Sequence, residues 1–318
     1  MLTVPKIAII IPVFNREHLL SFTLDSIIGQ SLTDWECILV DDHSTDQSMA
    51  VMEWYQKKDI RFKAYKRPNE IKKGANACRN FGFTKSKAPT IKWFDSDDIM
   101  LPEHLHIAYQ TLCEKDLDFV VTDTINFDHD THALLGRPYN FDRNKESITA
   151  ENLAKIRIGW ITDDFLGTRK IVDTVKFNEN ITTDGDEYNF FTRLLHHSCR
   201  GVFINKILTN RRIHSDSITN VNGENSSNYL FKNANIKYQT ANDLVVYNNK
   251  ALICWFLAGY MRIAFDLALA HKTLPYKKEA FKLICKYHSV KKGSAFLVAL
   301  FLGNHFKKGY NIMKYARK

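Results

Sequence analysis

The sequence predicts an α/β protein built around a doubly wound, mostly parallel sheet, and three observations point to this fold class. Strand-like and helix-like segments alternate through the N-terminal part of the chain, as is typical of such sheets. Residues 7–11 form an unbroken apolar run rich in isoleucine, the pattern of a strand buried on both faces. Acidic clusters follow the second and fourth predicted strands, where such sheets bind their ligands.

The individual elements can be placed in order from their apolar patterns. After the first strand, residues 17–29 carry a helical stripe of leucine and isoleucine that a glycine closes. Further strands are expected at 36–40, 61–65 and 90–94, with helices at 47–58 and 75–84. The following part is less regular, with strands expected near 118–123 and 201–208, a helix over 184–195, a polar loop at 220–228 and helices from about residue 229 onward.

The composition is that of an ordinary globular protein. The chain has 318 residues, of which 45% are hydrophobic and 25% charged, and these values exclude a disordered or collagen-like chain. Six cysteines lie far apart without the spacing of a zinc site. We therefore expect reduced cysteines and a cytoplasmic protein.

The formal net charge of +9 is concentrated at the C-terminus. Residues 271–318 hold twelve lysines and arginines and one acidic residue, a net charge of +11. The preceding 270 residues hold 32 basic and 34 acidic residues, a net charge of −2. Because nucleic-acid binding needs a basic face with aromatic or glycine-rich platforms, nucleic acid is not expected as a partner.

No signal peptide or membrane span is expected. The apolar run at the N-terminus is short, contains Pro12 and has no small-residue cleavage site after it. A span needs about 20 apolar residues, whereas the longest apolar stretches, 251–261 and 295–303, end at Arg262 and Asn304.

Residues 95–98, with the sequence DSDD, are the first candidate for a chemical role. Three carboxylates just after a buried strand can converge on a hard divalent cation such as Mg²⁺ or Mn²⁺. The alternative is a solvated acidic turn in which Asp98 caps the next helix.

Two further segments carry residues that suit a nucleotide. Asp41 and Asp42 end the second strand and can accept hydrogen bonds from ribose hydroxyls or a base, although one of them could equally cap the turn that follows. Gly74 opens a helix with Arg79 one turn inside it. A helix N-terminus and an arginine both attract phosphate, and the alternative for Arg79 is an ordinary surface position.

Together and in this order, these motifs resemble the family 2 glycosyltransferases with the GT-A fold. The resemblance covers about residues 5–220, some two thirds of the chain. The matching segments are IPVFN at 11–15, DDHSTD at 41–46, GANACRNFG at 74–82, DSDD at 95–98, DGDEYNFFTRL at 184–194 and RIHSDS at 212–217. Cys78 stands where the family usually has alanine.

The resemblance implies a GT-A catalytic domain over residues 1–225, with a nucleotide-sugar half at about 1–100 and an acceptor half at about 101–225, and a helical, basic extension at 226–318. It implies an inverting enzyme that moves a sugar from a nucleotide-diphosphate sugar, a UDP-sugar above all, to a hydroxyl of a glycan or lipid-linked acceptor in cell-surface polysaccharide synthesis. The implied cofactor is Mn²⁺ or Mg²⁺.

The resemblance also implies roles for single residues. The donor would contact Pro12, Phe14, Asn15, Asp41, Asp42, Gly74, Asn76, Arg79, Asp95 and Ser96. The metal would be held by Asp97, Asp98 and His214, and the sugar or acceptor pocket would include Trp160, Asp163 and Asp184. A structural role for His214 and a core position for Trp160 are the alternatives.

The general base is where the sequence departs from the family pattern. The family has Glu-Asp, with the aspartate as base, whereas this chain has Asp186-Glu187. Alignment on Phe190 and Arg193 makes Glu187 the base, with Asp186 or Asp184 as alternatives. The departure also raises a second hypothesis, a catalytically weak nucleotide-sugar-binding module of the same fold.

The C-terminal residues 295–318 combine apolar and basic side chains. This combination suits an interfacial helix on an anionic membrane, and it would place the protein peripherally on the inner face of the membrane. The alternative is that the apolar residues pack on the catalytic domain and leave the lysines in water.

Overall fold

The structure is a computed structural model that describes residues 4–182, 185–214 and 227–318. The chain divides into two compact units. An α/β unit comprises the described residues up to 182 together with 190–214, and a helical unit comprises 185–189 and 227–318. The expected domain boundary at 225 and most of the expected loop at 220–228 lie outside the described residues.

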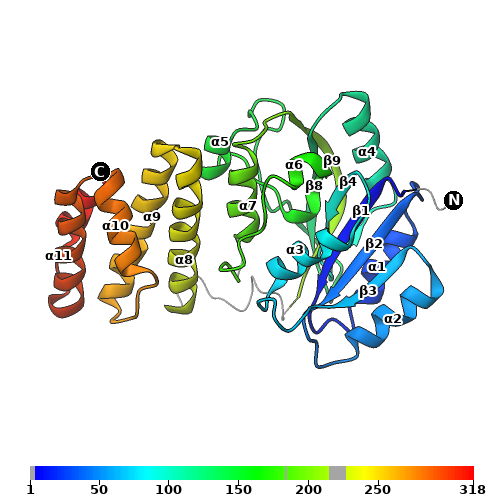
Figure 1. The fold of residues 1–318 in the computed structure, drawn as a ribbon, viewed down its shortest axis with the longest axis horizontal. Helices are drawn as coiled ribbons and strands as arrows, with labels where there is room; N and C mark the ends of the chain where they lie inside the picture. Colours follow the sequence, from blue (N-terminus) through cyan, green and yellow to red (C-terminus); the bar gives the residue numbers. More distant parts are fainter. Residues whose placement is uncertain (1–3, 183–184, 215–226) are drawn as a thin grey trace. The chain divides into compact units, whose positions relative to one another are not determined.

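The α/β unit is built on a nine-stranded sheet (Figure 1). Its N-terminal strands pair in parallel in the order β3-β2-β1-β4. They are β1 (Ile7–Val13), β2 (Trp35–Asp41), β3 (Phe62–Lys66) and β4 (Thr90–Trp93). The expectation of a mostly parallel sheet flanked by helices is confirmed for this half.

The second half of the sheet is mixed and continues in the order β8-β6-β9-β5. Its strands are β5 (Ile99–Met100), β6 (Phe119–Asp128), β7 (Leu134–Gly136), β8 (Phe165–Thr168) and β9 (Gly201–Ile213). β8 runs antiparallel to both β4 and β6, so it joins the two halves. The sequence did not predict β5, β7 or β8, because two to four residues are too few to show a period.

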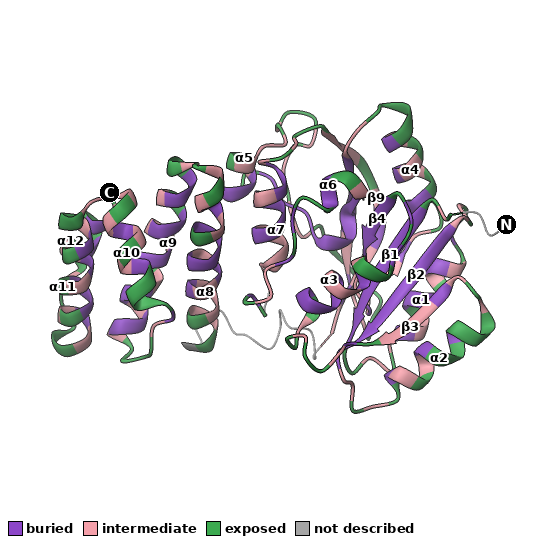
Figure 2. Cartoon of the chain, viewed as in Figure 1, coloured by how far each residue is buried: buried purple, intermediate pink, exposed green. Residues whose placement is uncertain are grey.

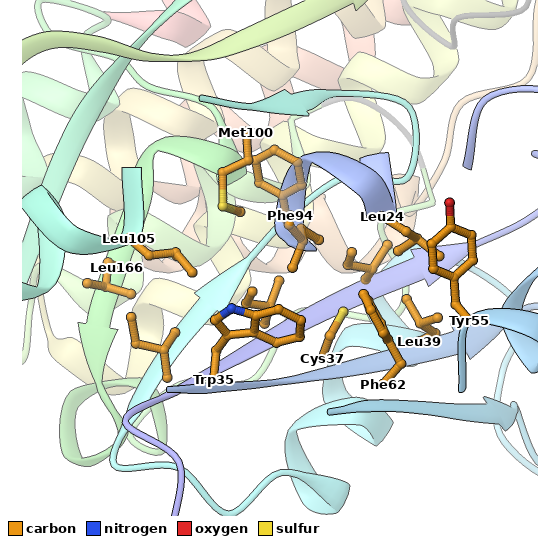
Figure 3. Packing of buried hydrophobic residues seen from close by; sticks show 14 of the residues in the cluster. Leu24, Trp35, Cys37, Leu39, Tyr55, Phe62, Phe94, Met100, Leu105 and Leu166 are labelled. Carbon is orange, nitrogen blue, oxygen red and sulfur yellow. The ribbon is translucent and has the colours of Figure 1, made fainter. Parts of the chain in front are cut away.

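Helices cover both faces of the parallel strands. Alternate side chains of β1 and β2, such as Ile9 and Leu39, join one buried cluster with helices on that face (Figure 3). These helices are α1 (Leu20–Ile28), α2 (Ser48–Lys58) and α4 (His104–Glu114). On the other face, α3 (Ala75–Lys85) packs so closely that a Cβ at Gly82 would lie 2.5 Å from Ile10 Cγ2.

Shorter helices carry the chain between the later strands. They are α5 (Ala150–Ala154), the 3₁₀ turn η1 (Thr162–Asp164), α6 (Arg169–Val172) and α7 (Asp186–Leu194). The predicted helix over 184–195 is thus present as α7, and β9 extends five residues beyond the predicted end of its strand, from 208 to 213. This extension carries Arg212 back toward the acidic motif.

The helical unit confirms the expected helical C-terminal region. It contains α8 (Ser227–Asp243), the 3₁₀ turn η2 (Leu244–Tyr247), α9 (Lys250–Leu269), α10 (Lys277–Tyr287), α11 (Val290–Phe306) and α12 (Tyr310–Arg317). α9 is central to this packing, since it contacts α8, α10, α11 and α12.

α9 changes one expectation about membranes. The apolar stretch that was expected to end at Arg262 continues as helix to Leu269, giving a 20-residue helix that contains an 18-residue window with a mean hydropathy of 1.6. Among the described residues it is the one helix long and apolar enough to cross a membrane. Half of it is buried inside the unit, and the core helix of a folded unit satisfies the same criterion.

The basic C-terminal segment packs on the helical unit's own helices. Phe296, Leu300 and Met313 are buried, and Arg317 Nε donates a hydrogen bond to the carbonyl of Ala258 in α9. The other side of the same segment stays in water (Figure 2). Its exposed apolar side chains are Val298, Phe301, Phe306, Tyr310 and Tyr315.

Candidate active site

The strand ends of the parallel half gather most of the predicted site residues. β1, β2 and β4 are neighbours and all end at the same edge of the sheet. The N–H of Asp42 donates to the carbonyl of Val13 at 2.8 Å, which ties the ends of β2 and β1 together. The loops that follow these strands carry Phe14, Asp42 and the motif at 95–98.

Asp41 and Asp42 have different local roles. Both carboxylate oxygens of Asp41 accept the N–H of Ser44 at 3.2 Å, so Asp41 forms the turn, as one of the two alternatives expected. Asp42 pairs with Arg67 at 2.5 Å and accepts the N–H of Gly74 at 2.9 Å. Asp42 therefore positions the loop that opens α3.

The start of α3 is built for a close approach of the backbone. Gly74 has a φ of +134°, a conformation that favours glycine. Asn76 donates to the carbonyls of Asn178 and Ile181. Arg79 is 4% exposed, so the alternative of an ordinary surface arginine is wrong. Its guanidinium lies 2.8 Å from Asp95 Oδ1.

The residues at the end of β1 differ in exposure. Pro12 is buried within the strand, whereas the ring of Phe14 is 39% exposed with Lys73 Nζ 4.2 Å from its centroid. Asn15 has a φ of 51° and accepts the N–H of Thr45 at 2.8 Å. Phe14 therefore offers an accessible face for stacking, and Asn15 fixes the turn.

Asp97 lies between the side chains of Arg16 and His214. Its Oδ2 is 3.2 Å from Arg16 Nε and 3.1 Å from His214 Nε2. Burial by itself raises the pKa of Asp97, but the hydrogen bond from His214 and the charge of Arg16 lower the pKa below its ordinary value. Asp97 is thus an ionised carboxylate at neutral pH, and the structure brings it to His214 as the resemblance implied.

Arg212 links β9 to the same motif. Its N–H donates to Asp98 Oδ1 at 2.8 Å, and its Nε donates to the carbonyl of Asp97 at 2.8 Å. Its guanidinium also lies 3.0 Å from His129 Nδ1. Asp98 therefore anchors β9 and does not cap α4, whose N-cap residue is Glu103.

Three carboxylates converge beside this anchor. Oxygens of Asp95, Asp98 and Asp163 all lie within 4.8 Å of one another. Burial raises the pKa of both Asp98 and Asp163 well above the usual range, and the neighbouring carboxylates raise it further. The structure thus groups Asp98 with Asp95 and Asp163, whereas the resemblance grouped it with Asp97 and His214.

Of the remaining predicted site residues, Trp160 and Ser96 are buried, and Asp184 is not described. Trp160 is 3% exposed and packs on Phe191 and Phe203, which favours the core alternative over a sugar-stacking surface. Ser96 is 7% exposed. Asp184 lies outside the described residues.

The two candidates for the base lie in the first turn of α7, within the helical unit. Asp186 and Glu187 are both half-buried. Asp186 Oδ1 accepts the N–H of Glu187 at 2.9 Å, so this carboxylate has a backbone partner in its own turn. The choice between the two as base stays a prediction.

The sequence analysis gave no role to four cationic residues, Arg16, Arg67, Lys92 and Arg212, although Arg212 opens the segment 212–217 that matched the family. Each meets a carboxylate or its backbone from a distant segment, as Arg16 meets Asp97. Lys92 is fully buried, its Nζ donates to the carbonyl of Asp163, and burial lowers its pKa to about 8. A lysine inside a short apolar strand was the one available signal for such a buried charge.

The sequence was compared with models of known protein families. The family model for glycosyl transferase family 2 matches residues 8–173, just over half of the chain. The chain belongs to glycosyltransferase family 2. The matched range contains the strand ends and the motif at 95–98 described above.

This family 2 glycosyltransferase is also similar in sequence to individual bacterial glycosyltransferases. Glycosyltransferase GlyG of Streptococcus pneumoniae is 28% identical over 219 residues, 67% of this chain and 72% of the relative. GalNAc(5)-diNAcBac-PP-undecaprenol beta-1,3-glucosyltransferase of Campylobacter jejuni is 36% identical over 111 residues, 35% of this chain and 34% of the relative.

The fold of this family 2 glycosyltransferase has solved counterparts. The crystal structure of S. aureus TarS 1-349 in complex with UDP-GlcNAc aligns with a TM-score of 0.65 at 16% identity, over 98% of this chain and 89% of that one. The likeness shows a GT-A-like fold with a helical C-terminal region.

Proposed function

We propose that the chain is an inverting glycosyltransferase that uses a UDP-sugar donor and a glycan or lipid-linked acceptor in cell-surface polysaccharide synthesis. The observation that carries this proposal is the gathering of Asp95, Asp97 and Arg79 at the strand ends of a chain of this family. The names of similar proteins support the donor and acceptor classes, since one structure holds UDP-GlcNAc and one relative acts on an undecaprenol-linked glycan.

The donor site fits a divalent cation. Asp97 Oδ2 and His214 Nε2 are 3.1 Å apart, which suits adjacent ligands of an octahedral ion with bonds of about 2.1 Å. Asp97 and His214 would hold Mn²⁺ or Mg²⁺, and the third predicted ligand, Asp98, is grouped with Asp95 and Asp163. When bound, the ion neutralises charge on the departing diphosphate.

The chain's own residues supply the remaining chemistry. Arg79, held by Asp95, presents a buried cationic group at the start of α3. Glu187 or Asp186 removes the proton from the acceptor hydroxyl as its oxygen bonds to the anomeric carbon and the bond to the diphosphate breaks. Attack opposite to the leaving group inverts the configuration.

The order Asp186-Glu187 is the one observation that favours a second candidate function. A base displaced by this exchange would leave a module that binds the nucleotide sugar with little transfer. Nucleotide binding without sugar transfer to any acceptor would support this alternative.

Nucleotide binding tests the donor site, and we expect UDP with Mn²⁺ to raise the midpoint of thermal unfolding. A ligand at 100 times its Kd stabilises the folded state by about 2.7 kcal/mol, or about 5–10 °C for a unit of this size. GDP, CDP and ADP with Mn²⁺ are the matched controls for base recognition. A rise with GDP and none with UDP would replace the proposed donor class.

An anionic membrane surface is the proposed partner of residues 295–318, in keeping with a lipid-linked acceptor on the cytoplasmic side. The segment's exposed aromatic side chains include Phe301, Phe306 and Tyr310. Exposed lysines, among them Lys308 and Lys314, lie on the same two helices and the turn that joins them. Aromatic rings and basic groups together favour the interface of a membrane with anionic lipids.

We expect the chain to sediment with vesicles of phosphatidylcholine and phosphatidylglycerol, and not with phosphatidylcholine alone. Changing Lys308 and Lys314 together to glutamine removes about 2 kcal/mol of attraction, so binding should weaken about 10- to 30-fold. The same double change at Lys57 and Lys58, exposed at the end of α2, is the control. Equal binding by both double variants would contradict the assignment to this segment.

A further inference from the structure

Beyond the donor site, one fully buried carboxylate has no role in the proposed mechanism. Asp163 lies in η1, about 65 residues after the DSDD motif, and is 0% exposed. We propose that Asp163 forms a second divalent-cation site with Asp95 and Asp98, assembled from protein groups alone and distinct from the Asp97–His214 pair. This proposal depends on the proposed function at one point, because Asp95 also forms the ion pair with Arg79 at the proposed donor site.

The spacing of the three carboxylates suits an ion of this class. Their oxygens lie within 4.8 Å of one another. Ligands of an octahedral ion with bonds of about 2.1 Å are about 3 Å apart on adjacent vertices and about 4.2 Å apart on opposite ones. A small adjustment of side-chain rotamers therefore brings all three oxygens into one coordination shell.

The hydrogen bonds of Asp163 leave one oxygen for a ligand. Its Oδ1 accepts the N–H of Asp95 at 3.0 Å, which holds the carboxylate against the motif. Its Oδ2 is buried and has no hydrogen-bond partner among the residues that the structure describes. A buried, unpartnered carboxylate oxygen is costly, and a bound cation removes that cost.

The charges around the three carboxylates are incompletely balanced. Arg79 pairs with Asp95, and the buried Lys92 donates its hydrogen bond to the backbone carbonyl of Asp163, leaving the carboxylate oxygens without it. The carboxylate of Asp98 accepts the backbone N–H of Arg212 on Oδ1 and lies beside the carboxylate of Asp163. The two buried carboxylates of Asp98 and Asp163 thus concentrate negative charge beside Asp95, which a bound divalent ion would offset.

The competing explanation is that the carboxylates of Asp98 and Asp163 share one proton, since burial raises the pKa of both. The two explanations differ in what Asn does at position 163. Asparagine keeps the acceptor for the N–H of Asp95 and can donate to Asp98, so it replaces a protonated carboxyl well. Asparagine is neutral, so it is a poor replacement for a negatively charged metal ligand.

The test is a titration of the full chain with Mn²⁺ in the absence of nucleotide. The electron paramagnetic resonance signal of free Mn²⁺ measures how much of the ion is bound. We expect Asp163→Asn to raise the Kd for Mn²⁺ at least tenfold. Asp164→Asn is the matched control, because Asp164 is the next residue, is also buried, and bonds to the hydroxyl of Thr124 at 2.6 Å. Its Kd should stay within twofold of wild type.

Thermal unfolding in EDTA separates loss of a ligand from loss of the fold. Without metal, Asp163→Asn should melt no lower than wild type, because the change removes a buried charge. With Mn²⁺, the rise in midpoint should be clearly smaller in Asp163→Asn than in wild type, because only the Asp97–His214 pair remains to bind the ion. Wild-type Mn²⁺ affinity in Asp163→Asn, or no Mn²⁺ binding by wild type without nucleotide, would overturn the proposal. Neither result depends on UDP binding, so the proposed donor site is tested separately.

Discussion

Asp97→Ala is expected to lower the release of UDP from a UDP-sugar at least 1,000-fold. Asp97 is the ionised carboxylate that joins His214 and Arg16 at the strand ends. Its loss removes a proposed metal ligand and leaves the Arg16 guanidinium and the His214 ring without their carboxylate partner. A 1,000-fold loss corresponds to about 4 kcal/mol of transition-state stabilisation, within the range of a lost metal contact.

The control for this change is Asp173→Ala, an exposed aspartate just after α6. It should release UDP at the wild-type rate. The circular dichroism spectrum and unfolding midpoint of Asp97→Ala should remain those of a folded protein, because Asp97 lies in the turn between β4 and β5 with its side chain partly exposed. Full turnover by folded Asp97→Ala would reject a metal-dependent donor site at this carboxylate.

Glu187→Gln is expected to lower kcat about 100- to 10,000-fold, the usual contribution of a general base. Asp186→Asn should lower kcat less than tenfold, because asparagine keeps the acceptor that the N–H of Glu187 uses. The two variants differ by one position on the same turn and are therefore matched. Initial rates at saturating donor and acceptor measure both.

The contrary order of effects would make Asp186 the base. In that case kcat would fall steeply in Asp186→Asn and little in Glu187→Gln. Equal wild-type rates in both variants would instead exclude this turn as the source of the base. The pH profile adds a second readout, since the acid limb of kcat should disappear only in the variant that lacks the base.

The parts of the fold with strong local patterns could be predicted from the sequence. Ile7–Val13 and Trp35–Asp41 are buried along their whole length, and an unbroken apolar run is the expected signature of such strands. Short strands such as Phe165–Thr168 gave no such signal, because their place in the sheet depends on pairing with β4 and β6. α9 was cut short at Arg262 because one charge interrupts an apolar run without ending a helix.

The site, like the fold, could be predicted only in part from the sequence. The strand ends bring Asp42 and the 95–98 motif together, as the rule for parallel sheets predicts. The partners of these carboxylates could not be predicted, since Asp97 meets Arg16 and Asp95 meets Asp163 across 68 to 81 residues of sequence. Asp41 shows a further limit, because the residue types that bind hydroxyls also form turns.

Thermal unfolding with UDP and Mn²⁺ tests whether the strand ends of the α/β unit form a metal-dependent site for a UDP-sugar. UDP and Mn²⁺ together should raise the midpoint of wild type by about 5–10 °C. UDP with EDTA should raise it much less, and adding UDP to Asp97→Ala in the presence of Mn²⁺ should not raise its midpoint further. If UDP raises the midpoint equally in EDTA and in Asp97→Ala, or does not raise it in wild type, the strand ends do not form a metal-dependent site for UDP.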